Sequence, residues 1–230
     1  MNKVLIFLEP TAEKLKRVSY ELITAGRNLA KVKNIPFDGV IFNSTNESIQ
    51  TAKEYGLSKV LHVNDSNFKQ YSVSLFAKAI SHIIQNNGYD FILFPANSYG
   101  NELAPRVAAS LQASFIADCT GFDYSGDDLI VTKPVYAGKA QIKAKMHGNI
   151  KICSLRPNVF TAIPEPVENI SIENVVPNVD LSAKREVIVD VLKNEGKLDV
   201  LEADIVVSGG RGIKGPENYY LIEQLANILN

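Results

Sequence analysis

Short apolar runs alternate with stretches of helical periodicity over the first 112 residues. The runs cover residues 4–8, 40–42, 60–63 and 91–94. Between them, apolar side chains recur every three or four positions, as at Leu15, Val18, Leu22 and Leu29, again over 73–84, and at Leu103, Val107 and Leu111. Strands that alternate with helices favour a parallel sheet with helices on both faces, and runs without polar alternation suit strands buried on both sides. We therefore expect an α/β fold with a doubly wound, mainly parallel sheet.

The pattern changes after residue 112. Three further strand-like runs, at 129–136, 140–146 and 151–155, follow, and His147-Gly148-Asn149 between the last two suits a hairpin connection. We expect antiparallel strands added to the parallel sheet. Four prolines (Pro157, Pro164, Pro166 and Pro177) predict an extended crossing segment over 156–180. With one more strand at 186–192 and a linker at 194–197, the first domain is expected to span residues 1–195.

A glycine-rich turn follows another predicted strand. Residues 204–208 are the strand, 209–215 read Gly-Gly-Arg-Gly-Ile-Lys-Gly, and Pro216 opens a helix whose apolar face holds Leu221, Ile222, Leu225 and Ile228. Gly210, Gly212 and Gly215 fit the spacing at which backbone N–H groups approach a phosphate or a flavin near a helix N-terminus. The spacing fits equally a tight turn that needs positive φ angles. Pro216 after Gly215 argues against a phosphate-binding P-loop.

One strand, one turn and one helix do not make a stable domain, because a lone helix needs a sheet to cover its apolar face. We therefore expect residues 199–230 to be the first βα unit of a second, incomplete domain, with its remainder outside these 230 residues.

Composition removes several classes of function. The net charge of −1 gives no electrostatic footprint for nucleic acid or an anionic membrane. Two cysteines, Cys119 and Cys153, and three histidines show no metal-ligand spacing, so we expect no metal site and two core thiols. No signal peptide or membrane span is recognisable, which predicts a cytoplasmic protein. The first turn, at residues 9–12, has no glycine and hence no obvious phosphate cradle.

The segment 203–218, with its Ser-Gly-Gly-Arg-Gly turn, resembles the start of the FAD domain of the electron-transfer flavoprotein alpha subunit. Upstream stretches are similar as well: 103–109 to the helix after the family's fourth strand, 117–120 to the turn that follows, and 133–140 with 155–160 to its added β region. The resemblance runs through the whole chain in order.

The resemblance implies an electron carrier with no catalytic residues of its own. It implies that Gly209, Gly210, Arg211 and Gly212 contact FAD, which the alpha subunit holds together with a beta subunit. It also implies electron donors of the acyl-CoA dehydrogenase class, as in fatty acid β-oxidation, and a membrane quinone oxidoreductase as acceptor. A guanidinium near the flavin would favour its reduced, anionic forms; the alternative is an Arg211 that only bridges carbonyl groups.

The family's other flavin-contacting motifs cannot be placed in this sequence. We therefore expect the chain alone not to retain stoichiometric FAD. Two other functions stay open: a nucleotide-binding regulatory module that uses the switch point of the sheet, and a fragment that pairs with a beta-like partner without a flavin. A yellow protein would favour the electron carrier, whereas nucleotide-dependent thermal stabilisation of a colourless one would favour the regulatory module.

Overall fold

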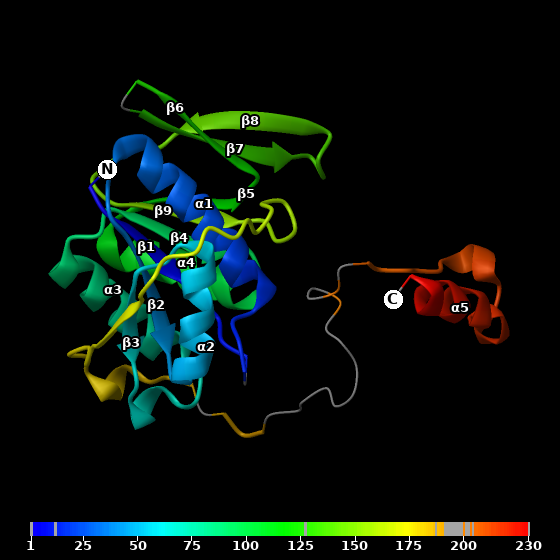
Figure 1. Ribbon diagram of the computed structural model, residues 1–230, viewed down its shortest axis with the longest axis horizontal. Coiled ribbons are helices and arrows are strands. Elements are labelled where there is room, and N and C mark those ends of the chain that lie inside the picture. The colour runs from blue at the N-terminus through cyan, green and yellow to red at the C-terminus, as the bar shows by residue number, and fades with distance from the viewer. Residues whose placement is uncertain are drawn as a thin grey trace. The chain divides into compact units, whose positions relative to one another are not determined.

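A computed structural model describes residues 2–11, 13–126, 128–186, 188–190, 200, 203 and 205–229 (Figure 1). The chain divides into two compact units, Met1–Val189 and Asp190–Asn230, and each is described by itself.

The first unit contains a seven-stranded sheet in the order β10-β3-β2-β1-β4-β9-β5. All of its pairings are parallel. The strands are β1 Val4–Phe7, β2 Phe37–Phe42, β3 Lys59–Val63, β4 Phe91–Pro95, β5 Ser114–Cys119, β9 Lys151–Leu155 and β10 Ser171–Asn174. The predicted α/β fold with a mainly parallel sheet is therefore confirmed.

Helices cover both faces of this sheet. They are α1 Arg17–Lys33, α2 Asn46–Gln50, α3 Val73–Asn87 and α4 Ser98–Leu111. Successive residues of β1 alternate between two cores, because side chains of a strand point to opposite faces. Val4 and Ile6 pack in the core that α1 and α2 complete, whereas Leu5 and Phe7 pack in the core that α3 and α4 complete.

The antiparallel strands form a sheet of their own next to α1 (Figure 1). Its members are β6 Gly121–Ser125, β7 Asp128–Val135 and β8 Ala140–Lys145, in the order β6-β7-β8. The predicted hairpin at 147–149 is wrong, because β9 pairs in parallel with β4 and β5 and not with β8. Four of the five residues of β9 are buried, as a central parallel strand requires, whereas β8 is almost wholly exposed.

The proline-containing segment after β9 crosses the outer side of α1. Polar side chains of α1 hold its backbone: Arg27 donates to the carbonyl of Ile163 at 3.1 Å, and Thr24 Oγ1 accepts from the N–H of Ile163 at 3.1 Å. Glu21 accepts from the N–H of Asn158 at 2.9 Å. The segment is extended as predicted, but it then forms β10, which the sequence analysis missed, at the edge of the sheet beside β3.

Two predicted strands find no support in the residues that the structure describes. Glu186 and residues 188–190 lie outside any strand, while the other residues of the 186–192 prediction and the whole 194–197 linker fall outside the described residues. Residues 205–208 are not a strand either, and Asp204 is outside the described residues. A strand needs a neighbour for its N–H and C=O groups, and the described residues of the second unit contain no strand.

The predicted last helix is confirmed, with a later start. Pro216–Asn218 is a single 3₁₀ turn, and the α-helix α5 spans Tyr220–Ile228. Both cysteines are buried free thiols, Cys119 at the end of β5 and Cys153 in β9, which confirms them as core residues. Among the described residues, no helix combines the length and the apolar character that crossing a bilayer requires.

Candidate functional site

The glycine-rich turn of the second unit is closed by hydrogen bonds from its later residues. The N–H of Ile213 donates to the carbonyl of Gly210 at 3.0 Å, and the N–H of Lys214 donates to the carbonyl of Arg211 at 3.1 Å. Asn218 Nδ2 adds a bond to the carbonyl of Ile213 at 2.8 Å. None of the backbone hydrogen bonds between described residues is donated by an N–H group of residues 209–212.

The glycines of this turn do not adopt left-handed φ angles. Gly210 has a φ of −106° and Gly215 a φ of −163°, and the positive φ of the turn, 69°, falls on Lys214. The interpretation that these glycines serve positive φ angles is therefore wrong. A Cβ atom on Gly210 or Gly212 would meet nothing within 4 Å, so glycine leaves the backbone open at these two positions.

Gly209 has a different reason to be glycine. A Cβ atom there would lie 2.9 Å from Cγ1 of Ile213 and 3.2 Å from Cγ1 of Ile222, so the side chain would collide with the turn and with α5. Gly209 lets the turn close against the helix, while Gly210 and Gly212 expose their N–H groups. A close approach to the backbone at these positions is what an anionic ligand requires.

Arg211 lies in the middle of the same turn, in the 3₁₀ segment Arg211–Ile213. Its side chain is exposed and makes no hydrogen bond or ion pair with any residue that the structure describes. An exposed guanidinium beside unbonded backbone N–H groups suits a diphosphate or another anionic group with two neighbouring oxygens, because it can donate two parallel hydrogen bonds. The residues present therefore fit one side of an FAD site, and their role in FAD binding stays a prediction.

The helix after the turn keeps its apolar side chains uncovered. In α5, the exposed fractions are 50% for Leu221, 47% for Leu225 and 78% for Ile228. Ile222 of the same helix lies against the turn at Gly209, whereas Leu221, Leu225 and Ile228 stay about half or more exposed among the described residues of the second unit.

The switch point of the large sheet lies between β1 and β4. Two residues after β1, the carboxylate of Glu9 accepts a hydrogen bond from Asn97 Nδ2 at 2.6 Å and pairs with Lys16 Nζ at 3.1 Å. Glu9 is 4% exposed. Glu9 was not among the predicted site residues, although the loop was expected to lack glycine; a carboxylate two residues after a buried strand was the available signal.

A second polar contact lies at residues 117–120, where the resemblance implied a turn. Residues 117–119 belong to the end of β5, where the register shifts between Ile116 and Cys119 and Asp118 has a φ of 63°. Arg156 donates to both carboxylate oxygens of Asp118, at 2.9 and 2.5 Å. Hydrogen bonds from this guanidinium lower the pKa of Asp118. The contact fixes the end of β9 to the bulge of β5.

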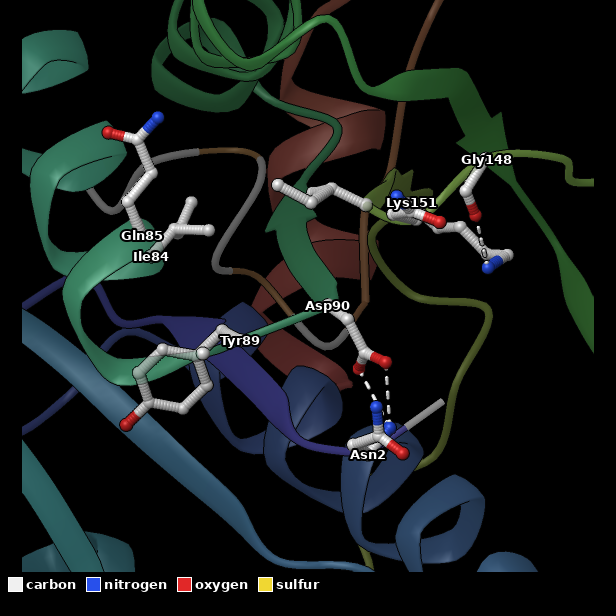
Figure 2. A pocket seen from close by; sticks show the side chains of 10 residues that line it. Asn2, Ile84, Gln85, Tyr89, Asp90, Gly148 and Lys151 are labelled. Carbon is white, nitrogen blue, oxygen red and sulfur yellow. Dashed lines mark hydrogen bonds between the residues drawn. The ribbon is translucent and has the colours of Figure 1, made fainter.

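A pocket of about 570 Å³ opens at the opposite, amino end of the strands (Figure 2). Its two charged side chains bond within the chain: Asp90 accepts from the N–H of Asn2 at 2.9 and 2.8 Å, and Lys151 Nζ donates to the carbonyl of Gly148 at 2.7 Å. The Tyr89 ring points away from both (Figure 2). Because ligands of doubly wound sheets bind at the carboxyl ends of the strands, this pocket is a poor candidate for the site.

The histidines do not gather. His62 lies in β3, His82 in α3 and His147 in the loop before β9. Burial lowers the pKa of His62, whose Nε2 accepts a hydrogen bond from the N–H of Ser44 at 3.3 Å. In the parts of the chain that the structure describes, no three His, Cys, Asp or Glu side chains lie close enough to hold a metal ion.

Comparisons with known proteins agree with the resemblance seen in the sequence. The family model described as "Electron transfer flavoprotein domain" matches residues 4–213, which includes most of the glycine-rich turn. The chain is 30% identical to the electron transfer flavoprotein subunit alpha of Bacillus subtilis (strain 168), over 99% of this chain and 70% of that protein. It is also 30% identical to the subunit of that name from Clostridium acetobutylicum, over 100% of this chain and 72% of the relative. Protein FixB of Clostridium saccharobutylicum is 29% identical over 98% of this chain and 69% of its own length.

Proposed function

The chain belongs to the electron transfer flavoprotein family, and we propose that it carries electrons as an alpha subunit that holds FAD together with a beta subunit. The observation that carries this proposal is the open turn of residues 209–212. Its unbonded N–H groups and the exposed Arg211 would face the diphosphate or the edge of the flavin. When bound, FAD supplies the redox chemistry, and the protein positions it and tunes its electronics.

Arg211 has the clearest electronic role in this proposal. Its guanidinium is a cation that has no counter-charge among the described residues. A fixed positive charge beside the cofactor favours the forms of the flavin that carry negative charge. Gly210 and Gly212 leave room for that approach, because their open faces hold no side chain.

The electron donors and the acceptor belong to the proposal as well. We propose dehydrogenases of the acyl-CoA class as donors and a membrane quinone oxidoreductase as acceptor, so that the chain carries electrons and transforms no substrate itself. The names of the alpha-subunit relatives support the electron-transfer role and specify no donor. A reducing compartment such as the cytoplasm fits the two free thiols.

Replacing Arg211 by Ala tests the proposed site. We expect the complex of this chain with an electron transfer flavoprotein beta subunit to bind FAD about 10- to 100-fold more weakly, because a charge-assisted hydrogen bond contributes about 1.5–3 kcal/mol. The measurement is FAD affinity by flavin fluorescence, together with the reduction potential of the bound flavin. Arg211→Lys should recover only part of the affinity, since it keeps the charge but loses the planar fork.

Lys214→Ala, on the same turn, is the matched control and should leave FAD affinity within about twofold. A wild-type complex that contains no flavin would contradict the proposed function itself. Unchanged affinity and potential in Arg211→Ala would instead leave Arg211 as a structural residue, with the function intact.

A further inference from the structure

The crevice between β1 and β4 is where a sheet of this topology would ordinarily bind a nucleotide. From these two strands the chain proceeds in opposite directions, to β2 and β3 on one side and to β9 and β5 on the other. Ligands bind at such a switch point outside the carboxyl ends of the strands, with phosphate groups at the N-terminus of a following helix. The first unit therefore has the topology of a nucleotide site.

Two helices begin at this crevice and direct their positive ends toward it. α1 follows β1, its N-cap residue Lys16 makes no side-chain cap, and no acidic residue lies in its first turn. α4 follows β4, and its N-cap residue is Asn97. Partial positive charge from both helix ends, together with the ammonium group of Lys16, favours an anion between them.

The carboxylate of Glu9 already lies at that position. Oε1 accepts from Nδ2 of Asn97 at 2.6 Å, and Oε2 lies 3.1 Å from Nζ of Lys16. The backbone of Glu9 is fixed as well, because its N–H donates to Ser19 Oγ at 2.9 Å and its carbonyl accepts from the N–H of Lys16 at 2.9 Å. An anion of the chain itself therefore joins the starts of α1 and α4.

The packing of α4 leaves little additional space beside Glu9. A Cβ atom on Gly100, in the first turn of α4, would lie 1.6 Å from the carbonyl oxygen of Pro95 at the end of β4. The helix thus lies directly on the end of the strand. The loop between β1 and α1 also has no glycine whose backbone could wrap a phosphate.

We propose that Glu9 is the built-in anion of the switch point and prevents the first unit from binding a nucleotide. A phosphate group would have to enter beside a buried carboxylate that already uses Lys16 and Asn97. Repulsion between the two anions, and competition for the Asn97 amide and for the charge of Lys16, exclude it. This inference concerns the first unit alone and does not depend on flavin binding by the second.

The test measures binding of inorganic pyrophosphate and of ADP to the full chain by calorimetry and thermal shift. We expect no saturable binding to the wild type, and at least tenfold tighter pyrophosphate binding to Glu9→Ala, because this variant frees Lys16, Asn97 and the helix ends. Glu9→Gln removes the charge but keeps the volume, so its gain should be smaller. Combining Glu9→Ala with Lys16→Ala should abolish the gain.

Glu13→Ala is the matched control, because it removes an exposed acid from the same loop and should bind no pyrophosphate. Saturable ADP binding to the wild type would overturn the proposal. A folded Glu9 variant that shows no gain in pyrophosphate binding would also overturn it, with folding checked by circular dichroism. Glu9→Gln keeps the size of the side chain and is the variant expected to fold in any case.

Discussion

The two units place the apolar faces of their helices in opposite surroundings. In α1 of the first unit, Leu22 and Ile23 are fully buried, whereas Leu225 and Ile228 in α5 of the second unit are 47% and 78% exposed. Both helices are amphipathic in sequence. The difference is that a seven-stranded sheet covers α1, while the described residues of the second unit provide no strand. An amphipathic pattern therefore predicts a helix, but it does not show what covers that helix.

Gly26 and Gly39 of the first unit differ from Gly210 and Gly212 of the second in a similar way. A Cβ atom on Gly26 would lie 2.6 Å from Cδ1 of Ile6, and one on Gly39 would lie 2.7 Å from Cδ1 of Leu8. These glycines of the first unit make room for core side chains. Gly210 and Gly212 make room for nothing in the chain, and their backbone stays open. Glycines that neither packing nor a positive φ angle requires, as at these two positions, are thus the better indication of a ligand site.

The largest expected effect separates a covered leucine from an uncovered one. Leu93 in β4 is fully buried, so Leu93→Ala should lower the free energy of unfolding by about 2–5 kcal/mol. Leu225→Ala removes the same atoms from a half-exposed site in α5 and should change it by less than about 0.5 kcal/mol. Urea unfolding followed by circular dichroism measures both.

A loss in Leu225→Ala as large as that in Leu93→Ala would break the comparison between the two units. It would show that other residues cover the apolar face of α5 in solution. Equal midpoints for both variants and the wild type would instead mean that Leu93 does not contribute to the core, which its burial contradicts.

The sequence was sufficient for the first unit up to α4 because its strands and helices follow periodicities that burial imposes. It failed where burial alone could not decide the pairing. The run 151–155 lies next to β8 in the chain and was predicted as its hairpin partner, yet its apolar side chains on both faces place it between β4 and β5. β10 was missed because Ser171–Asn174 is an exposed edge strand with one partner, so it lacks an apolar run.

The glycines in the sequence were enough to locate the candidate site, but they did not show why each position is a glycine. Spacing could not distinguish Gly209, which packs against Ile213, from Gly210 and Gly212, which stay open. Glu9 was missed because a single acid after a strand has no periodicity. Its meaning depends on Asn97, which is 88 residues away in the chain and meets it only after β1 and β4 have paired.

A smaller effect is expected from the buried cation of α1. Arg27 is 4% exposed and donates from NH1 to the carbonyls of Tyr55 at 2.6 Å and Ile163 at 3.1 Å. Arg27→Met keeps much of the volume but leaves both carbonyls without their donor. We expect a loss of about 1–3 kcal/mol in the free energy of unfolding.

Lys31→Met, one helical turn further along α1, is the control for this prediction. Its ammonium group pairs with Glu165 on the surface, and exposed ion pairs contribute little to stability because solvent screens them. Amide hydrogen exchange should therefore rise over the crossing segment 156–170 in Arg27→Met and stay near the wild type in Lys31→Met. The reverse order would assign the fixing of this segment to its surface ion pair.

The contact that fixes the chain just before the second unit gives the smallest effect. Glu186 lies three residues before the boundary at Val189. Its carboxylate accepts hydrogen bonds from the hydroxyl groups of Ser72 and Ser74, at the start of α3, each at 2.6 Å. Partial burial raises the pKa of Glu186, but the hydrogen bonds from both serines outweigh this and lower the pKa to about 2. The ionised carboxylate therefore stabilises the first unit.

The pH dependence follows from this depressed pKa. In the unfolded chain Glu186 titrates near its ordinary value of 4.5, so its stabilisation is complete above that pH and is lost as the pH falls through the folded pKa of about 2. Because the group is partly exposed, we expect it to contribute about 1 kcal/mol at neutral pH. Glu186→Gln keeps an oxygen acceptor for the serines but removes the charge. The difference between this variant and the wild type in the free energy of unfolding, measured with urea, should be constant from pH 7 to 5 and shrink toward zero at pH 2 to 3.

Glu168→Gln, which changes an exposed acid of the crossing segment, is the control and should show no such trend. A difference for Glu186→Gln that stays the same at every pH would mean that the shape of the side chain, and not its charge, fixes the end of the first unit to α3.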